Sequence, residues 1–100
     1  MRPEPERPWQ LVGFIDRLDL WMELESPDDD LRLQVTDWIF TRYTDPYEGV
    51  RRAPGFANLW FGQIAGTRRD PDSAVFCAYW IQERGHSLRC DSITTLSLPA

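Results

Sequence analysis

The hydrophobic pattern of this chain changes its period near the middle, and that change restricts the fold more than any other feature. Between Trp9 and Tyr43 the apolar residues recur at spacings of three and four, which predicts two amphipathic helices. After Pro54-Gly55, segments rich in β-branched and aromatic residues predict strands instead. Helices followed by consecutive strands favour an α+β domain.

The predicted helices are bounded by recognisable start and stop signals. The first helix is expected from Trp9 to Glu25 and ends at Ser26-Pro27, because the residue before a proline avoids the helical conformation. The second is expected to begin in the segment 27–30 and to end about Tyr43. Its three consecutive aspartates complement the helix dipole and can cap free N–H groups. Three adjacent carboxylates do not converge on one ion, so capping is favoured over metal binding.

Three strands are expected in residues 57–64, 74–81 and 88–98. The segment 74–81 is apolar throughout, so we expect a central strand that is covered on both faces. The segment 88–98 alternates in a single phase along its length, and a turn is expected at residues 83–86. The predicted fold is therefore two N-terminal helices packed on a three- to four-stranded antiparallel sheet, with a further short strand possible before the first helix.

Length and composition predict one domain in residues 9–100, preceded by an extended lead-in in residues 1–8, which contain three prolines. No apolar run approaches the roughly 20 residues needed to cross a bilayer, and the N-terminus lacks the apolar region of a secretory signal. We therefore expect a cytoplasmic protein without a membrane partner. In that compartment Cys77 and Cys90 are expected to be free thiols that pack as small apolar side chains.

Charge is distributed unequally between the two halves of the chain. Residues 1–50 carry twelve acidic and five basic side chains, whereas residues 51–100 carry four acidic and six basic ones. All eleven basic residues are arginine, which suits bidentate recognition of phosphate and carboxylate groups but is also expected from a GC-rich genome. The asymmetry predicts separate faces or separate partners.

The sequence contains no Walker loop, dinucleotide-binding glycine pattern, zinc-finger spacing or nucleophile elbow, so no cofactor or metal is expected. His86 is the single side chain with an ordinary pKa near neutrality. It is a candidate general base for RNA cleavage, although a histidine in a turn more often serves only as a surface residue.

Arginine pairs mark the ends of the first predicted strand of the second half. Arg51-Arg52 precede it and Arg68-Arg69 follow it, while Arg89 lies on the last strand. Guanidinium groups around one sheet can bind RNA phosphates or an acidic peptide, and loop arginines can equally serve solubility. Four nearby aromatic residues can stack bases or pack in the core, namely Trp60, Phe61, Tyr79 and Trp80.

The order of two helices, a Pro/Gly-containing link and a three-strand meander resembles the RelE/ParE superfamily of bacterial toxins. The segment 50–64 is similar to the basic loop and following Leu-Trp strand of that family, and the segment 75–81 is similar to its central strand. The resemblance covers roughly residues 9–98. It implies a toxin of a type II toxin–antitoxin system, with a cognate antitoxin as partner. Homo- or hetero-oligomers are compatible with it.

The resemblance also implies how such a protein acts. RelE-like members cut messenger RNA on the ribosome with side chains displayed on the sheet, whereas ParE-like members inhibit DNA gyrase. The candidate catalytic residues here are Arg68, Arg69, Tyr79, His86 and Arg89. The candidate RNA- or partner-binding residues are Arg51, Arg52 and Trp60.

The sequence departs from the family at two points that bear on catalysis. Phe76 and Cys77 stand where the central strand of the family usually carries an arginine, and the chain has no lysine and a net charge of −5. Because positive charge dominates affinity for nucleic acid, these departures favour a non-catalytic toxin over a nuclease. The alternative is a non-enzymatic, acidic interaction domain that binds a basic protein.

Overall fold

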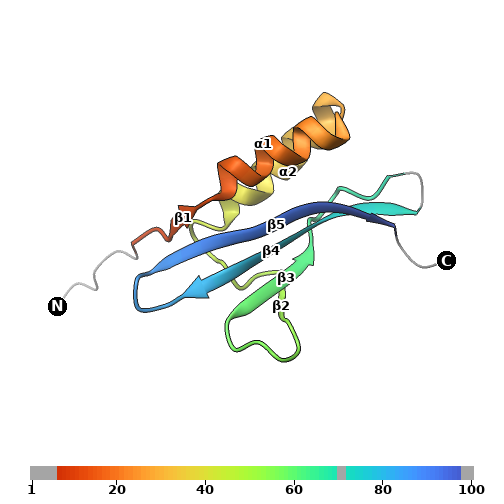
Figure 1. The fold of residues 1–100 in the computed structure, drawn as a ribbon. Coiled ribbons are helices and arrows are strands. Elements are labelled where there is room, and N and C mark those ends of the chain that lie inside the picture. Colours follow the sequence, from red (N-terminus) through yellow and green to blue (C-terminus); the bar gives the residue numbers. More distant parts are fainter. Residues whose placement is uncertain (1–6, 70–71, 98–100) are drawn as a thin grey trace.

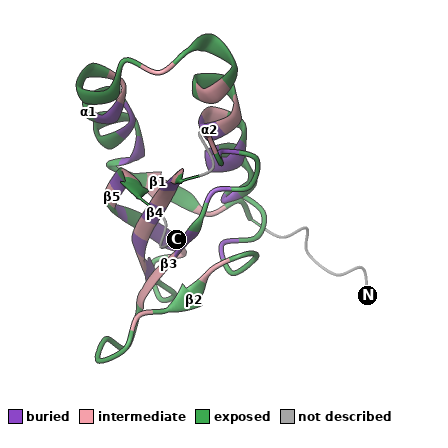
Figure 2. Cartoon of the chain, turned by 90° about the vertical axis from the view of Figure 1, so that its right-hand side faces the viewer, coloured by how far each residue is buried: buried purple, intermediate pink, exposed green. Residues whose placement is uncertain are grey.

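A computed structural model of the protein describes residues 7–69 and 72–97 and shows two layers, a pair of helices and a sheet (Figure 1). In chain order the elements are β1 (Gln10–Val12), α1 (Phe14–Glu25), α2 (Asp29–Thr41), β2 (Arg51–Arg52), β3 (Leu59–Gln63), β4 (Ser73–Gln82) and β5 (Ser87–Ser97). Both helices lie on one face of the sheet, and no helix of the described part lies on the other (Figures 1 and 2). The α+β class and the two helices are confirmed. Most of the predicted lead-in, residues 1–6, lies outside the described residues.

The sheet has five strands in the order β1-β5-β4-β3-β2, rather than the three or four expected. The pairs within β2–β5 are antiparallel, but β1 pairs in parallel with β5, so the expectation of a purely antiparallel sheet was wrong. The strands β1 and β2 have three and two residues and are too short to show a period of two. Their pairing depends on contacts with distant parts of the chain.

The first helix begins at Phe14, five residues later than expected. The preceding residues 10–12 extend along β5, and Gly13 adopts a left-handed conformation with φ 78° before the helix starts. Glycine adopts positive φ without steric cost, so this position lets the chain turn from strand to helix. The buried residues of α1 are Phe14, Leu18 and Trp21, on the side turned to the sheet (Figure 2).

The second helix is capped as the sequence indicates. The side chain of Asp28 accepts a hydrogen bond of 2.8 Å from the backbone N–H of Leu31, which satisfies one free donor of the first turn. Asp29 and Asp30 follow in that turn, where carboxylates are favoured by the helix dipole. The helix ends at Thr41, and Arg42 is its C-cap residue.

The strand β4 is central, but it is covered on one face only. Val75, Cys77, Tyr79 and Ile81 are buried under the helices, whereas alternate residues such as Trp80 are only half-buried on the other face. The expectation that both faces are covered was therefore wrong. An unbroken apolar run is typical of a doubly covered strand. Here the apolar residues of the second face remain accessible because the chain supplies only two helices and both pack on the same side.

A β-bulge in β5 changes which residues face the helices. The register shifts between Ala78 and Tyr79 of β4, so Cys90 lies opposite Tyr79 while Ile93 lies opposite Cys77. Beyond the bulge Ile93 is buried, and Thr95 accepts a hydrogen bond of 2.9 Å from Trp21 Nε1 of α1. The single alternating phase expected for residues 88–98 was wrong, because the extra residue of a bulge inverts the alternation that follows.

Close backbone packing positions the segment before β2 against the sheet. A Cβ atom on Gly62 of β3 would lie 2.5 Å from the carbonyl oxygen of Gly49 and 3.0 Å from a side-chain methyl of Val50. Only glycine allows this approach, which sets the edge at which β2 joins β3.

No helix within residues 7–69 and 72–97 has both the length and the apolar character required to cross a membrane.

Candidate functional site

The pair Arg51-Arg52 is divided between the two faces of the sheet. Successive side chains of a strand point to opposite faces, so the two arginines of β2 cannot act as one site. Arg51 pairs with Phe61 of β3 on the helix-free face, and its guanidinium carbon lies 5.8 Å from the centre of that ring. Arg52 pairs with Trp60, which belongs to the helix-facing side together with Tyr79.

A second arginine lies over an aromatic ring of the same helix-free face. The guanidinium carbon of Arg89 on β5 is 5.9 Å from the centre of the Trp80 ring on the neighbouring β4. Phe56, from the loop between β2 and β3, contacts the same ring edge-to-face at 5.8 Å. The distance from Arg51 to the Phe61 ring and the distance from Arg89 to the Trp80 ring are both within the roughly 6 Å range of cation–π attraction.

Strand register aligns these groups in two adjacent rows. One row contains Arg51, Phe61, Ala78 and Ser92, and the other contains Leu59, Trp80 and Arg89. With strands roughly 4.8 Å apart, the first row is roughly 14 Å wide. We call this surface the open face, and it consists of Arg51, Leu59, Phe61, Phe76, Ala78, Trp80 and Arg89.

The centre of the open face forms a shallow hollow of about 340 Å³. It is lined by Leu59, Phe61, Phe76, Cys77, Ala78, Ser92, Thr94 and Leu96. None of these lining residues is charged, and Arg51 lies over one of them, Phe61. Flat apolar groups can pack in such a hollow while the guanidinium groups hold attached anions. The open face thus presents two cations, and none of the described residues that form it is a general base.

Arg52 and Trp60 belong to a separate groove on the helix-facing side. Trp60 contacts Tyr47 edge-to-face at 5.2 Å, and the hydroxyl of Tyr47 donates a hydrogen bond to the carboxylate of Glu83. The groove is lined by Tyr47, Arg52, Ala57, Asn58, Trp60, Ile81, Gln82, Glu83 and Arg84. Partial burial, followed by the contact with Glu83, raises the pKa of Tyr47 to about 12, so this phenol is not a base near neutral pH.

Tyr79 was expected among the displayed catalytic residues, but its side chain is fully buried beneath the helices. Its hydroxyl accepts a hydrogen bond of 3.1 Å from Arg42 and donates one to the carbonyl of Pro46. Burial is the main cause that raises the pKa of Tyr79 to about 12, against the opposing effect of Arg42. A buried phenol with both hydrogen bonds made serves the core, not a substrate.

Arg42 is a buried arginine that organises this region, and it follows the helical spacing of the apolar residues of α2 as its C-cap residue. Its side chain is 1% exposed and packs with its guanidinium carbon 4.1 Å from the centre of the Trp38 ring. It also donates to the carbonyl of Glu48 at 2.7 Å, so it ties the segment after α2 to the core. Its helical spacing from Val35, Trp38 and Ile39 predicts the apolar side of the helix, but its complete burial depends on Glu48 and Tyr79, which lie outside that helix.

Arg68 and Arg69 lie in the loop before β4. Arg69 donates a hydrogen bond of 2.9 Å to Asp30 at the start of α2 and another of 2.9 Å to the carbonyl of Gly66. It also pairs with Ser73 through an isolated bridge. Arg69 therefore links the loop to α2. The side chain of Arg68 is exposed.

His86 lies at the opposite end of β4, where it holds the N-terminal segment. Its ring stacks on Trp9 at 4.0 Å between ring centres, and its Nε2 lies 2.7 Å from the carbonyl oxygen of Arg7. The backbone carbonyl of His86 accepts a hydrogen bond of 2.9 Å from the N–H of Gln10. These contacts explain the position of His86 without a substrate.

The predicted catalytic residues therefore do not converge. Arg68 and Arg69 precede a strand of ten residues and His86 follows it, which separates them by roughly 30 Å. Arg51 and Arg89 do share a surface with Phe61 and Trp80. Strand alternation predicts that Trp60 and Phe61 lie on opposite faces, but only the pairing of β2 with β3 decides that Phe61 shares the face of Arg51.

The two cysteines are free and buried, as expected from their apolar surroundings. The contact with Cys90, followed by burial, raises the pKa of the Cys77 thiol well above its ordinary value. A protonated, buried thiol is a poor nucleophile and a poor metal ligand. In the part of the chain that the structure describes, no group of three or more histidine, cysteine or acidic side chains has a metal-binding arrangement.

Comparisons of the chain with protein-family models, curated proteins and solved structures find no significant match.

Proposed function

We propose that this protein is a toxin-like component of a type II toxin–antitoxin system, of the RelE/ParE kind, and that its open face contacts the target. The observation that carries the proposal is the presence of Arg51 over Phe61 and Arg89 over Trp80 on a sheet face without a helix. Display of cationic side chains on the sheet is what the family resemblance implies. The order of two helices followed by a meander supports the same proposal.

Binding of a single-stranded RNA is the action that the open face suits best. Bases can stack on the accessible rings, with each stacked base worth roughly 1–3 kcal/mol, while guanidinium groups attract the phosphates. The lysine-free, acidic chain otherwise repels nucleic acid, so contact is restricted to this surface. Because Tyr79 is buried and His86 is remote, we propose that growth inhibition proceeds by occupancy of the target and not by cleavage.

Expression of the full chain alone in bacteria tests the proposal. We expect growth arrest that is relieved by co-expression of a protein encoded by the adjacent gene. The variant Arg51→Ala/Arg89→Ala should abolish arrest while remaining folded, and Arg17→Ala/Arg32→Ala, which removes two arginines from the helices, is the matched control. Harmless expression of soluble wild-type protein would contradict the proposal. RNA sequencing during arrest separates messenger cleavage from occupancy, and a supercoiling assay detects inhibition of gyrase.

A second candidate function is a non-enzymatic interaction domain that binds a basic protein. It is favoured by one observation, the acidic character of the helix layer. The two helices carry seven carboxylates and two arginines, a balance of −5, which equals the net charge of the whole chain. A stable partner without growth arrest, retained by the variant Arg51→Ala/Arg89→Ala, would favour this function over the first.

A further inference from the structure

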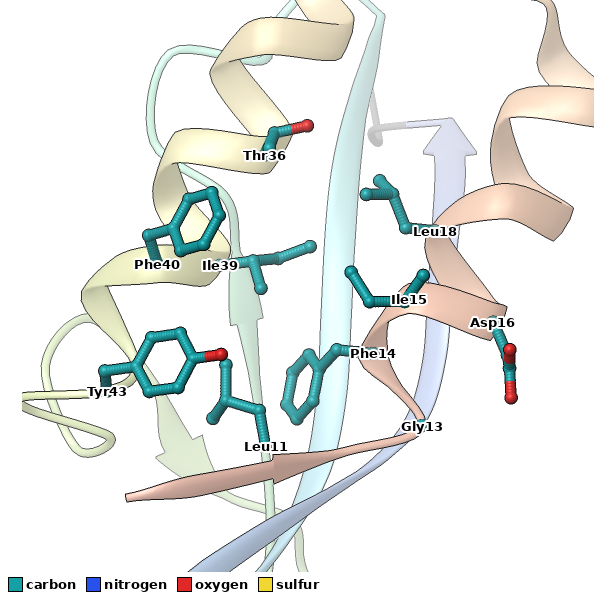
Figure 3. A pocket seen from close by; sticks show the side chains of 10 residues that line it. All are labelled: Leu11, Gly13, Phe14, Ile15, Asp16, Leu18, Thr36, Ile39, Phe40 and Tyr43. Atoms are coloured by element: carbon teal, nitrogen blue, oxygen red, sulfur yellow. The ribbon is translucent and has the colours of Figure 1, made fainter. Parts of the chain in front are cut away.

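An apolar cleft lies between α1 and α2, on the side of the molecule opposite the open face (Figure 3). Side chains from both helices and from β1 converge on it. The lining residues are Leu11, Gly13, Phe14, Ile15, Asp16, Leu18, Thr36, Ile39, Phe40 and Tyr43. Its volume is about 130 Å³. An apolar cavity of roughly 150 Å³ holds one benzene-sized group, so this cleft has room for one large apolar side chain.

The residues at the mouth of the cleft are unusually exposed for their type. Ile15 is 63% exposed and Phe40 is 57% exposed, and they approach the cleft from opposite helices (Figure 3). Of the ten large apolar side chains that are exposed in the described part of the chain, seven lie between Val12 and Tyr43. The helices pack on the sheet and leave their facing flanks apart (Figure 2). Three of these seven, Ile15, Phe40 and Tyr43, line the cleft. Exposed apolar groups that adjoin one another in this way are typical of an interaction surface.

Both helices that form the cleft also carry carboxylates. Asp16 is among the lining residues, with its carboxylate turned to the outer side of α1 (Figure 3), and Asp19 and Asp37 lie one helical turn from Asp16 and Phe40. All three are exposed, and within residues 7–69 and 72–97 none of them takes part in an ion pair. By contrast, Asp29 and Asp30 at the start of α2 pair with Arg32 and Arg69. The carboxylates of Asp16, Asp19 and Asp37 are therefore available to pair with cations of a partner.

The negative charge of the two helices restricts the kind of ligand that can bind in the apolar cleft. A nucleic acid or an anionic membrane surface would be repelled by the helix layer, whose balance is −5. A second copy docking through the same face would meet like charge. A basic amphipathic segment satisfies both features, because it supplies apolar side chains on one flank and cations on the other.

We propose that the cleft between α1 and α2 binds a basic amphipathic helix of a partner protein, with one large apolar side chain inserted between Ile15 and Phe40. Lysine or arginine residues of that segment pair with Asp16, Asp19 and Asp37. This inference deepens the second candidate function and is independent of the toxin proposal, because the cleft and the open face lie on opposite sides of the sheet.

Fluorescence titration of the full chain with a synthetic helical peptide tests the inference. The probe is a peptide of about 16 residues with leucine at positions i, i+3, i+4 and i+7 and lysine on its other faces. The matched probe has glutamate in place of every lysine. We expect the lysine peptide to bind at least ~10-fold more tightly than the glutamate peptide, and we expect added salt to reduce this difference.

Variants of the mouth locate the binding site. Ile15→Ser and Phe40→Ser should each weaken binding of the lysine peptide roughly 10-fold, because they remove the apolar walls that hold an anchor side chain. Leu24→Ser is the matched control, since Leu24 is 74% exposed on α1 but does not line the cleft. All three residues are exposed, so circular dichroism and the unfolding midpoint should change little.

Each outcome decides for or against the inference. Equal affinity for the two peptides, or unchanged binding by Ile15→Ser and Phe40→Ser, overturns it. Sedimentation that shows a wild-type dimer, converted to monomer by Phe40→Ser, identifies a second copy as the occupant and also overturns it. The variant Arg51→Ala/Arg89→Ala should retain peptide binding, so failure of the toxin proposal and failure of this inference are distinguishable.

Discussion

The two faces of β4 carry side chains of similar apolar character but have opposite roles. Val75 and Tyr79 point to the helices and are 1% and 0% exposed, whereas Phe76 and Trp80 point to the open face and remain accessible. Arginine follows the same division. Arg42 is buried with its hydrogen bonds satisfied, while Arg51 and Arg89 lie over half-buried rings. Position on the strand, rather than residue type, decides which side chains are buried in the core and which remain accessible.

The largest expected difference between the two faces concerns adjacent aromatic residues of β4. Tyr79→Ala should lower the free energy of unfolding by about 3–5 kcal/mol, since it leaves a cavity beneath the helices and frees the guanidinium of Arg42. Trp80→Ala should lower it by less than about 2 kcal/mol, because that ring is already partly exposed. Urea denaturation measures both values. Equal losses would show that the open face is as structural as the covered one.

Loss of the buried Arg42 should likewise lower the free energy of unfolding more than loss of the surface Arg51. The difference between them should be smaller than the difference between Tyr79 and Trp80. Arg42→Met should cost about 2–3 kcal/mol, because it leaves the hydroxyl of Tyr79 and the carbonyl of Glu48 without a buried donor. Arg51→Met should change stability by no more than about 0.5 kcal/mol, as expected for a surface position. The comparison fails if the unfolding midpoints in urea of the two variants coincide.

The open face should also be detectable by the salt dependence of RNA binding. For a short single-stranded RNA, Arg51→Ala/Arg89→Ala should reduce the slope of log affinity against log salt by about 1.4, which corresponds to about 0.7 for each phosphate contact. Arg17→Ala/Arg32→Ala should leave the slope unchanged. A wild-type protein without measurable RNA affinity at low salt would remove RNA as the ligand of this face.

The smallest expected effect concerns two tyrosines on the helix-facing side. Tyr47 and Tyr79 have pKa values of about 12 against an ordinary 10.0, so the folded state favours the neutral phenols. Their contribution to stability is complete below pH 10 and is lost as pH rises toward 12. Glu83→Gln should lower the pKa of Tyr47 in part and leave Tyr79 unchanged, as measured by ultraviolet titration of tyrosinate. If Glu83→Gln changed the pKa of both tyrosines, the two phenols would share one electrostatic environment.

Much of the local structure follows from local chemistry. Asp28 precedes a first turn rich in carboxylate and caps α2, and the apolar run around Phe76 becomes the central strand. The start of α1 was expected too early because residues 9–12 have a helix-like spacing, while their pairing with β5 depends on a segment that lies far away in sequence. The structure separates the residues of the predicted site. Arg51 and Arg89 share the open face, but Arg68, Arg69 and His86 are held elsewhere by contacts that no spacing reveals.

By itself, the sequence determined the α+β class, the acidic helix pair, the order of the main elements and the arginines around the meander, because periodicity, capping and charge are local properties. The tertiary structure alone decided which face of each strand is covered. The bulge beside Tyr79 and the parallel pairing of β1 arise from long-range packing, and so does the burial of Arg42. Two helices on one side of a five-stranded sheet leave the other side uncovered. That geometric fact, absent from any local pattern, separates the open face from the cleft between the helices.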